Sequence, residues 1–417
     1  MKALFLLASL GAAAVPVWEA PLEIAAGRAD KGPWRQNDSR YDYVDDATVA
    51  FVPGGGHLVA WADQKGKDVW LRHISGDGRA GAAVNVSRSP ATFSWLPRIA
   101  VDPARAGRVY LLWQEIIFSG GSHGGDILFA ASHDGGQSFA APRNLSRSIG
   151  GDGKGQLDRR TWSNGSLDLA VGADGTLFAA WTEYHGALWL ARSRDGGAAF
   201  SAPRRIAGDD ARPARGPSLA AGPGGIVHLA WSVGADPQAA IRVATSRDNG
   251  ASFTAPQLVG TGEGRLDAPR LASGGGRLHL VYARRRGPGL ASEVRYASAT
   301  AARFGASRTL SAPVTAGGAA YAMLASDGGT GLAVAWENMG ADGRAQSLGM
   351  SLSRDAGRNF SAPSELPGSA APPGGSNGSQ QGLLGQKLAL GHDGRIAIVN
   401  SSLQPGVRSR VWLMRSR

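Results

Sequence analysis

Two arginines stand in nearly identical short motifs, Arg98 in PRIA (97–100) and Arg270 in PRLA (269–272). The surrounding sequence repeats along the chain, and the repeats align on an Ala shared by these motifs. Two residues before that Ala, the repeats carry Thr48, Arg98, Asp168, Ser218, Arg270, Met323 and Lys387. A guanidinium fork matches the planar oxygens of a carboxylate better than an ammonium group does. Arginines gathered at one register therefore indicate a site for an anionic group.

Two further registers of the same repeats carry groups that could do chemistry. Two residues before the first register stand Asp46, Leu96, Ser166, Gly216, Ala268, Tyr321 and Gly385. Two residues after a recurring aromatic position stand Asp63, Glu115, Glu183, Val233, Arg284, Asn338 and Ser402. Acidic and basic groups occur together in these sets, which is typical of a polar mouth and not of an apolar plug.

The elements that must position these residues are short strands between Gly, Asp and Pro turns. The second strand of each repeat is expected at 55–61, 107–113, 175–181, 225–231, 276–282, 330–336 and 394–400. A third strand is expected at 68–75, 126–133, 187–194, 240–247, 293–300, 347–354 and 410–417. Seven such pairs predict an all-β fold, a β-propeller of four-stranded blades with seven blades in preference to six.

The two ends of the chain predict how the ring closes. The chain stops after the third strand RVWLMRSR (410–417), whereas WEAPLEI (18–24) resembles the outer strands of the other repeats. We therefore expect the N-terminal strand to complete the last blade, which leaves no exposed sheet edge there. Residues 15–417 form one predicted domain, in which the Gly- and Ser-rich inserts 147–165 and 364–382 are expected to be loops.

A polar loop of the form S-x-D-x-G-x-x-F occurs four times, around Asp134, Asp195, Asp248 and Asp355. The carboxylate can accept hydrogen bonds from the backbone of its own turn, and the Gly permits a positive φ. One active site needs one set of groups, so four copies indicate a folding device.

These four loops resemble the Asp-box, or BNR repeat, of the sialidase-like (neuraminidase) superfamily of propellers. The resemblance implies a scaffold whose Asp-boxes lie on the face opposite the active site. It also implies an exo-sialidase-like glycoside hydrolase that clamps a substrate carboxylate with three arginines and uses a Tyr nucleophile, a Glu partner and an Asp acid. The matching candidates for the clamp are Arg98 and Arg270, with Arg284 or Lys387 as the third member. Tyr321 or Tyr184 would be the nucleophile, Glu115 or Glu183 its partner, and Asp46 the acid.

Two other functions remain open. The chain could be a non-catalytic propeller that binds a glycan or a protein. It could also resemble the propeller polysaccharide lyases, which use Tyr or His as base, since Glu183-Tyr184-His185 is compatible with uronate cleavage. His228 and His279 fall inside second strands and are predicted to be core residues.

The start of the chain, MKALFLLASLGAAAV, predicts a signal peptide over residues 1–14 and a secreted or periplasmic protein. No later run predicts a membrane span. The net charge of +11 favours an acidic glycan or glycoconjugate as partner, and no basic run suggests nucleic acid. Cysteine is absent, and no motif indicates a metal or another cofactor. A monomer is expected.

Overall fold

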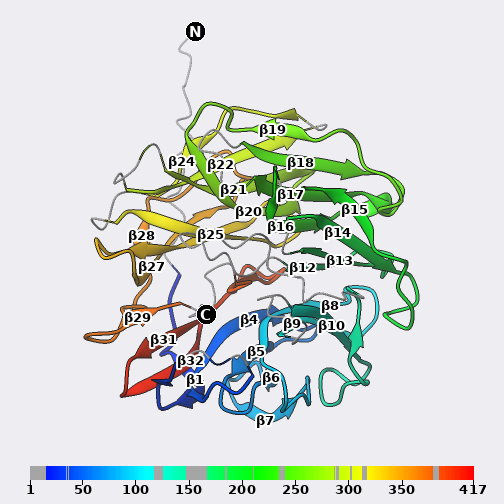
Figure 1. The fold of residues 1–417 in the computed structure, drawn as a ribbon. Helices are drawn as coiled ribbons and strands as arrows, with labels where there is room; N and C mark the ends of the chain where they lie inside the picture. The colour runs from blue at the N-terminus through cyan, green and yellow to red at the C-terminus, as the bar shows by residue number, and fades with distance from the viewer. Residues whose placement is uncertain are drawn as a thin grey trace.

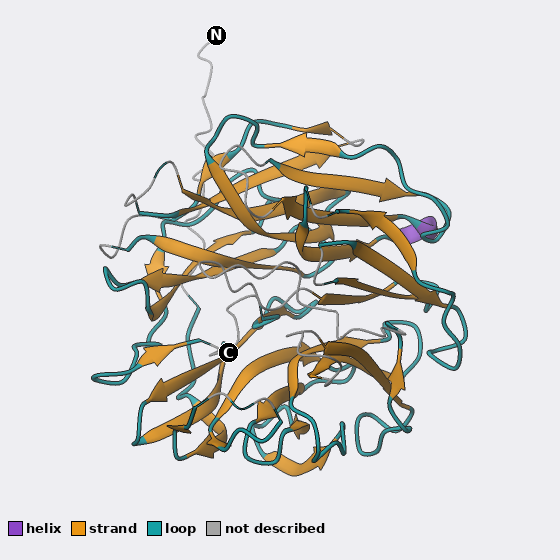
Figure 2. Cartoon of the chain, viewed as in Figure 1, coloured by secondary structure: helices purple, strands orange, loops and turns teal. Residues whose placement is uncertain are grey.

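The computed structural model of the chain describes residues 16–417 except 34, 36, 117–124, 147–166, 184–185, 210, 234–239, 286, 288–290, 301–302, 312–316 and 379–384. Regular structure in the described residues is β-strand, apart from the short 3-10 turn η1 (Pro223–Gly225) (Figure 2). The predicted all-β class is therefore confirmed. The predicted signal peptide (1–14) and the insert 147–165 lie outside the described residues.

Four antiparallel sheets have four strands each, in the order of the chain. The first contains β4 (Val44–Phe51), β5 (His57–Asp63), β6 (Asp68–Ile74) and β7 (Ala80–Asn85). The second contains β8 (Ser94–Val101), β9 (Val109–Ile116), β10 (Gly125–Ser132) and β11 (Arg143–Asn144). The third contains β12 (Leu167–Val171), β13 (Leu177–Thr182), β14 (Leu188–Ser193) and β15 (Arg204–Ala207). The fourth contains β16 (Ala214–Ala221), β17 (Val227–Val233), β18 (Ile241–Ser246) and β19 (Gln257–Val259).

The remaining sheets follow the same meander with additions. One contains β20 (Arg265–Gly274), β21 (Arg277–Arg285), β22 (Glu293–Thr300), β23 (Arg303–Phe304) and β24 (Arg308–Thr309). Another contains β25 (Ala319–Ser326), β26 (Leu332–Met339), β27 (Ala345–Ser353) and β28 (Ser364–Glu365). The short β29 (Ser376–Asn377) joins it to β30 (Leu388–Leu390), β31 (Ile396–Gln404), β32 (Arg408–Arg415) and β1 (Leu22–Gly27). A separate ribbon pairs β2 (Asp30–Lys31) with β3 (Tyr41–Asp42).

The sheets are arranged in a ring, because the first strand of each sheet contacts the first strand of the next (Figure 1). The series runs through β4, β8, β12, β16, β20, β25 and β30, and β30 contacts β4 again. These first strands are called the inner strands below. A closed series of four-stranded meanders is the architecture of a β-propeller.

The N-terminal strand closes this ring. β1 pairs with β32 in an antiparallel register that includes Leu22↔Leu413 and Gly27↔Ser409. Trp18 extends the pairing through a bridge to Ser416. The predicted closure of the last sheet by the N-terminal segment is thus confirmed. Every hydrogen bond across this seam joins residues from opposite ends of the chain.

Apolar side chains from neighbouring sheets fill the space between them. One cluster joins Leu112 and Phe129 of the second sheet to Leu169 and Trp181 of the third. Trp113, Trp181 and Trp336, at the aromatic positions of second strands, are each at most 1% exposed. These large rings bury extensive apolar area, which explains why the repeats keep an aromatic residue there.

The four repeated Asp loops share one hydrogen-bond pattern. In the copy at Asp195, Oδ1 accepts from the Ala199 amide at 2.9 Å and from the Ser193 hydroxyl at 2.7 Å. The copies at Asp134, Asp248 and Asp355 have the same two contacts, to the amide four residues later and the Ser two residues earlier. The predicted role of these carboxylates within their own turns is confirmed.

The predicted loop insert 364–382 differs in its described part. Its first residues form β28, the outer strand of its sheet, and residues 376–377 form β29, which pairs with β27 and β31. The Gly- and Pro-rich composition concealed these pairings, because two-residue strands carry no period that a sequence pattern can reveal.

Candidate functional site

The inner strands share a bulge at the predicted register. The ladder to the second strand shifts around Asp46, Leu96, Gly216, Ala268 and Tyr321, which have φ values between 53° and 57°. This left-handed conformation is unfavourable for residues other than glycine, and bulges redirect the side chains that follow. The equivalence of these positions, inferred from sequence alone, is therefore a structural equivalence.

Charged side chains gather inside the ring just after these bulges. We call this group the axial polar cluster, and it consists of Asp46, Arg98, Asp168, Arg270, Glu337 and Lys387. Five of these residues are at most 9% exposed, and the sixth, Asp168, has a side chain 14% exposed. Burial makes each charge depend on its neighbours, because isolated ions are costly away from water.

Arg98 and Arg270 come from β8 and β20, whose sheets are separated in the ring by the sheet of β12, which carries Asp168, and the sheet of β16. Arg98 Nε lies 4.0 Å from Asp168 Oδ1. Burial lowers the pKa of Arg98 to about 10, and the nearby positive charge of Arg270 acts in the same direction. Burial also lowers the pKa of Arg270, which Asp168 opposes. The two predicted clamp arginines thus share Asp168 as an acidic neighbour.

Asp46 stands at the bulge of β4 and reaches the neighbouring sheet. Its Oδ2 accepts a hydrogen bond from the Leu96 amide at 3.1 Å. Burial, together with the adjacent Asp45, raises the pKa of Asp46 well above its usual value, while Arg98 and Lys387 oppose the shift. A carboxyl group with a raised pKa holds its proton at higher pH than an exposed Asp does, which favours a general acid.

Lys387 is held in a buried ion pair and not in an arginine clamp. Its Nζ lies 2.6 Å from Glu337 Oε1 and 3.0 Å from Asn400 Oδ1. Glu337 is fully buried, and Lys387 is 1% exposed. Because this ammonium already neutralises Glu337, the prediction of Lys387 as a third carboxylate ligand is not supported by the geometry.

Arg284 lies in a different group, near the end of β21. It forms ion pairs with Glu293 of β22 and, at 3.6 Å, with Glu263. Arg295 Nε also lies 3.4 Å from Glu263. The described contacts of Arg284 therefore join it to an acidic group of its own, formed by Glu263 and Glu293.

Tyr321 occupies the bulge of β25 and is partly buried. Burial raises the pKa of its phenol, and the charges of Asp267 and Glu337 act in the same direction. In ring order, β25 with Tyr321 and β4 with Asp46 are the two neighbours of β30, and Lys387, just before β30, pairs with Glu337. The acidic neighbours of this phenol are Asp267 and Glu337, and neither was among its predicted partners.

Glu115 and Glu183 have local roles in the described structure. Glu115 accepts hydrogen bonds from Trp113 Nε1 at 3.1 Å and Thr92 Oγ1 at 3.1 Å, and burial raises its pKa. The backbone of Glu183 forms a tight turn with Gly186 and Ala187. Neither residue is brought beside Tyr321 by a contact in the described residues. Tyr184 and His185 lie outside those residues.

Two members of the cluster were missed as candidates. Asp168 shares the register of Arg98, and this position could have identified it as the acid between two arginines. Glu337 stands one residue after Trp336, whereas the predicted register lies two residues after the aromatic position. The residue at that register, Asn338, accepts a hydrogen bond from the Trp336 indole at 2.9 Å. The register therefore includes structural acceptors for tryptophan as well as candidate catalytic groups.

Neither a metal centre nor a membrane-crossing helix is found in the part of the chain that the structure describes. There, no group of three or more His, Cys, Asp or Glu side chains could hold an ion. No helix in that part has the length and apolar character that crossing a membrane requires.

Comparisons with known proteins support the fold at low sequence identity. No family model matches the chain, and neither does any curated protein sequence. A polysaccharide lyase of family PL25, an ulvan lyase bound to -[GlcA(1-4)Rha3S]-, is 9% identical with a TM-score of 0.56, over 94% of this chain and 95% of that one. A protein of unknown function from Dyadobacter fermentans is 12% identical with a TM-score of 0.52, over 90% and 99% of the two chains.

The NanB sialidase from Streptococcus pneumoniae is 10% identical with a TM-score of 0.50, over 77% of this chain and 67% of that one. Identities this low establish a shared fold and leave activity to be argued from the site. The chain is therefore a β-propeller with the fold of glycan-active enzymes.

Proposed function

We propose that this chain binds an acidic saccharide, with the sugar carboxylate between Arg98 and Arg270 in the axial polar cluster. The observation that carries the proposal is that two guanidinium groups, both at most 9% exposed, share one acidic neighbour, Asp168. A carboxylate placed between them would balance the second positive charge and accept charge-assisted hydrogen bonds. The basic character of the whole chain would also draw an anionic ligand toward the ring.

Arg284 and Lys387 are each paired with acidic residues. Of the predicted cations, Arg98 and Arg270 are therefore the two proposed to bind the carboxylate. Glu293 and Glu263 neutralise Arg284, and Glu337 neutralises Lys387. Two arginines suffice to orient one planar anion. Binding of a uronate or sialate unit is therefore the function that the geometry supports best, and a binding propeller needs no more than this.

Sialidase-like hydrolysis is the catalytic candidate, and the raised pKa of Asp46 is the observation that favours it. Asp46 would protonate the leaving oxygen as general acid. Tyr321 would be the nucleophile, with Glu337 or Asp267 as the nearby acidic group. The ion pair of Glu337 with Lys387 would have to be exchanged for such a role.

Uronate elimination is a second catalytic candidate, favoured by the similarity to the ulvan lyase bound to a uronate-containing saccharide. Arg98 and Arg270 would then neutralise the uronate carboxylate, which makes the adjacent proton easier to remove. Tyr321 would be the base in the described residues, although burial raises its pKa and disfavours the phenolate that a base requires.

We further propose that the inner strands belong to seven blades of an exported, monomeric propeller of the Asp-box type. The closed contact series, the pairing of β1 with β32 and the shared hydrogen bonds of the four Asp loops support this proposal. Export rests on the sequence of residues 1–14.

The experiment is calorimetric titration of the protein with glucuronate and N-acetylneuraminate, followed by the same titration of variants. Arg98→Ala and Arg270→Ala should each lose about 1.5–3 kcal/mol of binding free energy, the range for hydrogen bonds to charged groups. Arg98→Lys should not restore affinity, because an ammonium cannot form the two-pronged contact. Arg395→Ala, which removes an exposed arginine paired with Asp393, is the control.

Melting temperatures identify variants that fail to fold, a necessary check because Arg98 is 1% exposed. Unchanged affinity in both folded alanine variants would refute the carboxylate site. Release of sialic acid from a fluorogenic sialoside, or formation of an unsaturated uronate from a polyuronate, would separate the two catalytic candidates from binding alone.

A further inference from the structure

The ring is hollowed at a different level from the axial polar cluster. A cavity of about 790 Å³ lies where inner strands end and second strands begin. Its wall includes residues near these turns from five sheets, namely Pro103, Val171, Gly222, Gly275 and Gly328. Along β20, the wall residue Gly274 stands four positions after Arg270 of the axial polar cluster, which is on the order of 13 Å of strand. The cavity and the cluster therefore lie at different levels along the inner strands.

The cavity continues outward between the sheet of β16–β19 and the sheet of β20–β24. Val243, Leu278 and Phe304 give this extension an apolar wall, and Thr245 and Thr254 add hydroxyl groups. Leu258, next to the wall residue Gln257, is 49% exposed. A mostly apolar lining with a few polar groups, at this volume, is typical of a site for a small organic molecule.

The charges of the lining are of one sign. Among the described residues that line the cavity, the charged ones are Arg247 and Arg277, and none is Asp or Glu. Arg277 Nη2 donates to Ser298 Oγ at 2.8 Å, whereas its buried Nε has no hydrogen-bond partner in the described part of the chain. His228 also lines the cavity and is partly exposed, so its prediction as a core residue is wrong. Burial and the charge of Arg247 lower the pKa of His228 to about 4, which keeps it neutral.

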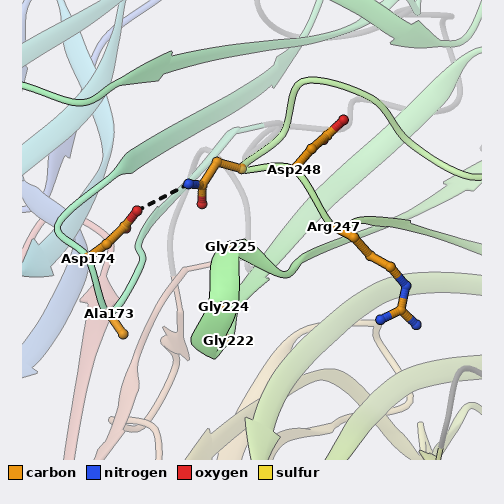
Figure 3. A pocket seen from close by; sticks show the side chains of 8 residues that line it. Ala173, Asp174, Gly222, Gly224, Gly225, Arg247 and Asp248 are labelled. Atoms are coloured by element: carbon orange, nitrogen blue, oxygen red, sulfur yellow. Dashed lines mark hydrogen bonds between the residues drawn. The ribbon is translucent and has the colours of Figure 1, made fainter.

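Two carboxylates near Arg247, those of Asp174 and Asp248, are already bound by other groups. A smaller cavity of about 290 Å³ adjoins the first and shares Ala173, Gly222 and Arg247 with it (Figure 3). Asp174 accepts a hydrogen bond from Asn249 there, and the Arg247 side chain extends away from that contact. Asp248 accepts hydrogen bonds from Ser246 and Ser252. Arg247 can therefore present its guanidinium to a ligand in the larger cavity.

We infer that this cavity is a second ligand site, which takes an organic anion with an apolar body, such as an aryl or alkyl carboxylate or sulfonate. The apolar body would lie against Val243, Leu278 and Phe304. The anionic group would bind Arg247 and the buried Nε edge of Arg277. This site is separate from the acidic-saccharide site proposed above and takes a ligand of different chemistry.

The test is titration of the whole chain with naphthalene-1-sulfonate, alongside 1-naphthol and inorganic sulfate as probes that lack the charge or the apolar body. Naphthalene-1-sulfonate should bind most tightly. Arg247→Ala should weaken it about tenfold, the lower end of the range for a hydrogen bond to a charged group. Ala255→Trp, which places a bulky ring in the outer part of the cavity, should weaken it comparably without removing any charge.

Arg194→Ala is the matched control, because Arg194 is the exposed equivalent of Arg247 in the SRDGG loop of the neighbouring sheet and does not line the cavity. It should leave the affinity unchanged, as should Arg98→Ala in the axial polar cluster. Equal affinity for 1-naphthol, or equal loss in Arg194→Ala and Arg247→Ala, would overturn the proposal. A loss of naphthalene-1-sulfonate affinity confined to Arg98→Ala would place the probe in the axial polar cluster and would also overturn the proposal. Failure of glucuronate to bind would contradict only the proposed saccharide site.

Discussion

Charged groups of the axial polar cluster are buried and paired between sheets. The carboxylates of the four repeated turns are instead bonded within their own loops, and three of the four, Asp134, Asp195 and Asp248, are exposed. Glu337 and Lys387 lie 50 residues apart and meet with almost no exposure to water. Asp195, by contrast, finds its partners two and four residues away. The first arrangement requires the assembled ring, while the second needs only a short stretch of chain.

This difference has an energetic consequence. A buried charge that loses its partner incurs a large desolvation cost, whereas an exposed carboxylate that loses a turn contact is still hydrated. Substitutions in the two regions should therefore differ in the size, and in one case the sign, of their effect on stability.

The largest effect is expected for Lys387→Met, which leaves the buried Glu337 carboxylate without its cation. The free energy of unfolding should fall by about 3–5 kcal/mol, the range for breaking a buried pair. Urea denaturation measures it. Adding Glu337→Gln to Lys387→Met should recover part of the loss, because the uncompensated charge is then gone.

Lys65→Ala is the matched control for this prediction. Lys65 Nζ lies 3.3 Å from Asp42, and its side chain is 72% exposed. Its removal should change stability by less than about 1 kcal/mol. Equal effects of Lys65→Ala and Lys387→Met would contradict the contrast between buried and exposed pairs.

A smaller effect is expected for Asp195→Ala in one repeated turn. The lost hydrogen bonds to Ala199 and Ser193 should reduce the free energy of unfolding by about 1 kcal/mol, the usual net value for a hydrogen bond. Saccharide affinity should not change, because the turn lies away from the axial polar cluster. Thermal denaturation and calorimetric titration of the same sample measure both, with the exposed Glu365→Ala as control. A folded variant that no longer binds saccharide would place the turn in the site.

The smallest effect, of opposite sign, is expected for Asp46→Asn. Asn tolerates the left-handed backbone at this bulge and can accept the Leu96 hydrogen bond without a buried charge. At pH 7 the variant should be more stable than the parent by about 0.5–1 kcal/mol, within the range of single stabilising changes.

The pH dependence of this difference follows from the raised pKa of Asp46. The pKa of Asp46 is higher in the folded protein than in the unfolded chain. At pH values between these two pKa values, Asp46 is protonated in the folded protein and charged in the unfolded chain. The parent therefore gains stability from this group as the pH falls from neutral through the folded pKa. Unfolding curves at pH 7 and pH 5 should show the advantage of Asp46→Asn shrinking, and a constant difference would contradict the raised pKa.

Much of the fold could be predicted from the sequence because its determinants are local. Strand alternation, glycine turns and the aromatic position of the second strands recur in each repeat, and β1 carries the outer-strand pattern that closes the ring. The Asp turns could be predicted down to their hydrogen bonds, since donor and acceptor lie within four residues. The register of Arg98 and Arg270 followed from the same repetition.

The partners of the charged residues were decided by tertiary structure. The sequence offered Arg98 and Arg270 with Arg284 or Lys387 as a third cation, but packing placed Arg284 beside Glu293 and Lys387 beside Glu337. Arg98 and Arg270 instead share Asp168 as an acidic neighbour. The repeat pattern predicts the position of each residue along its strand. The side chain that it contacts on another sheet depends on how the closed ring packs the sheets together. Buried charges are sensitive to that packing, so the candidate site could be known only once the ring was assembled.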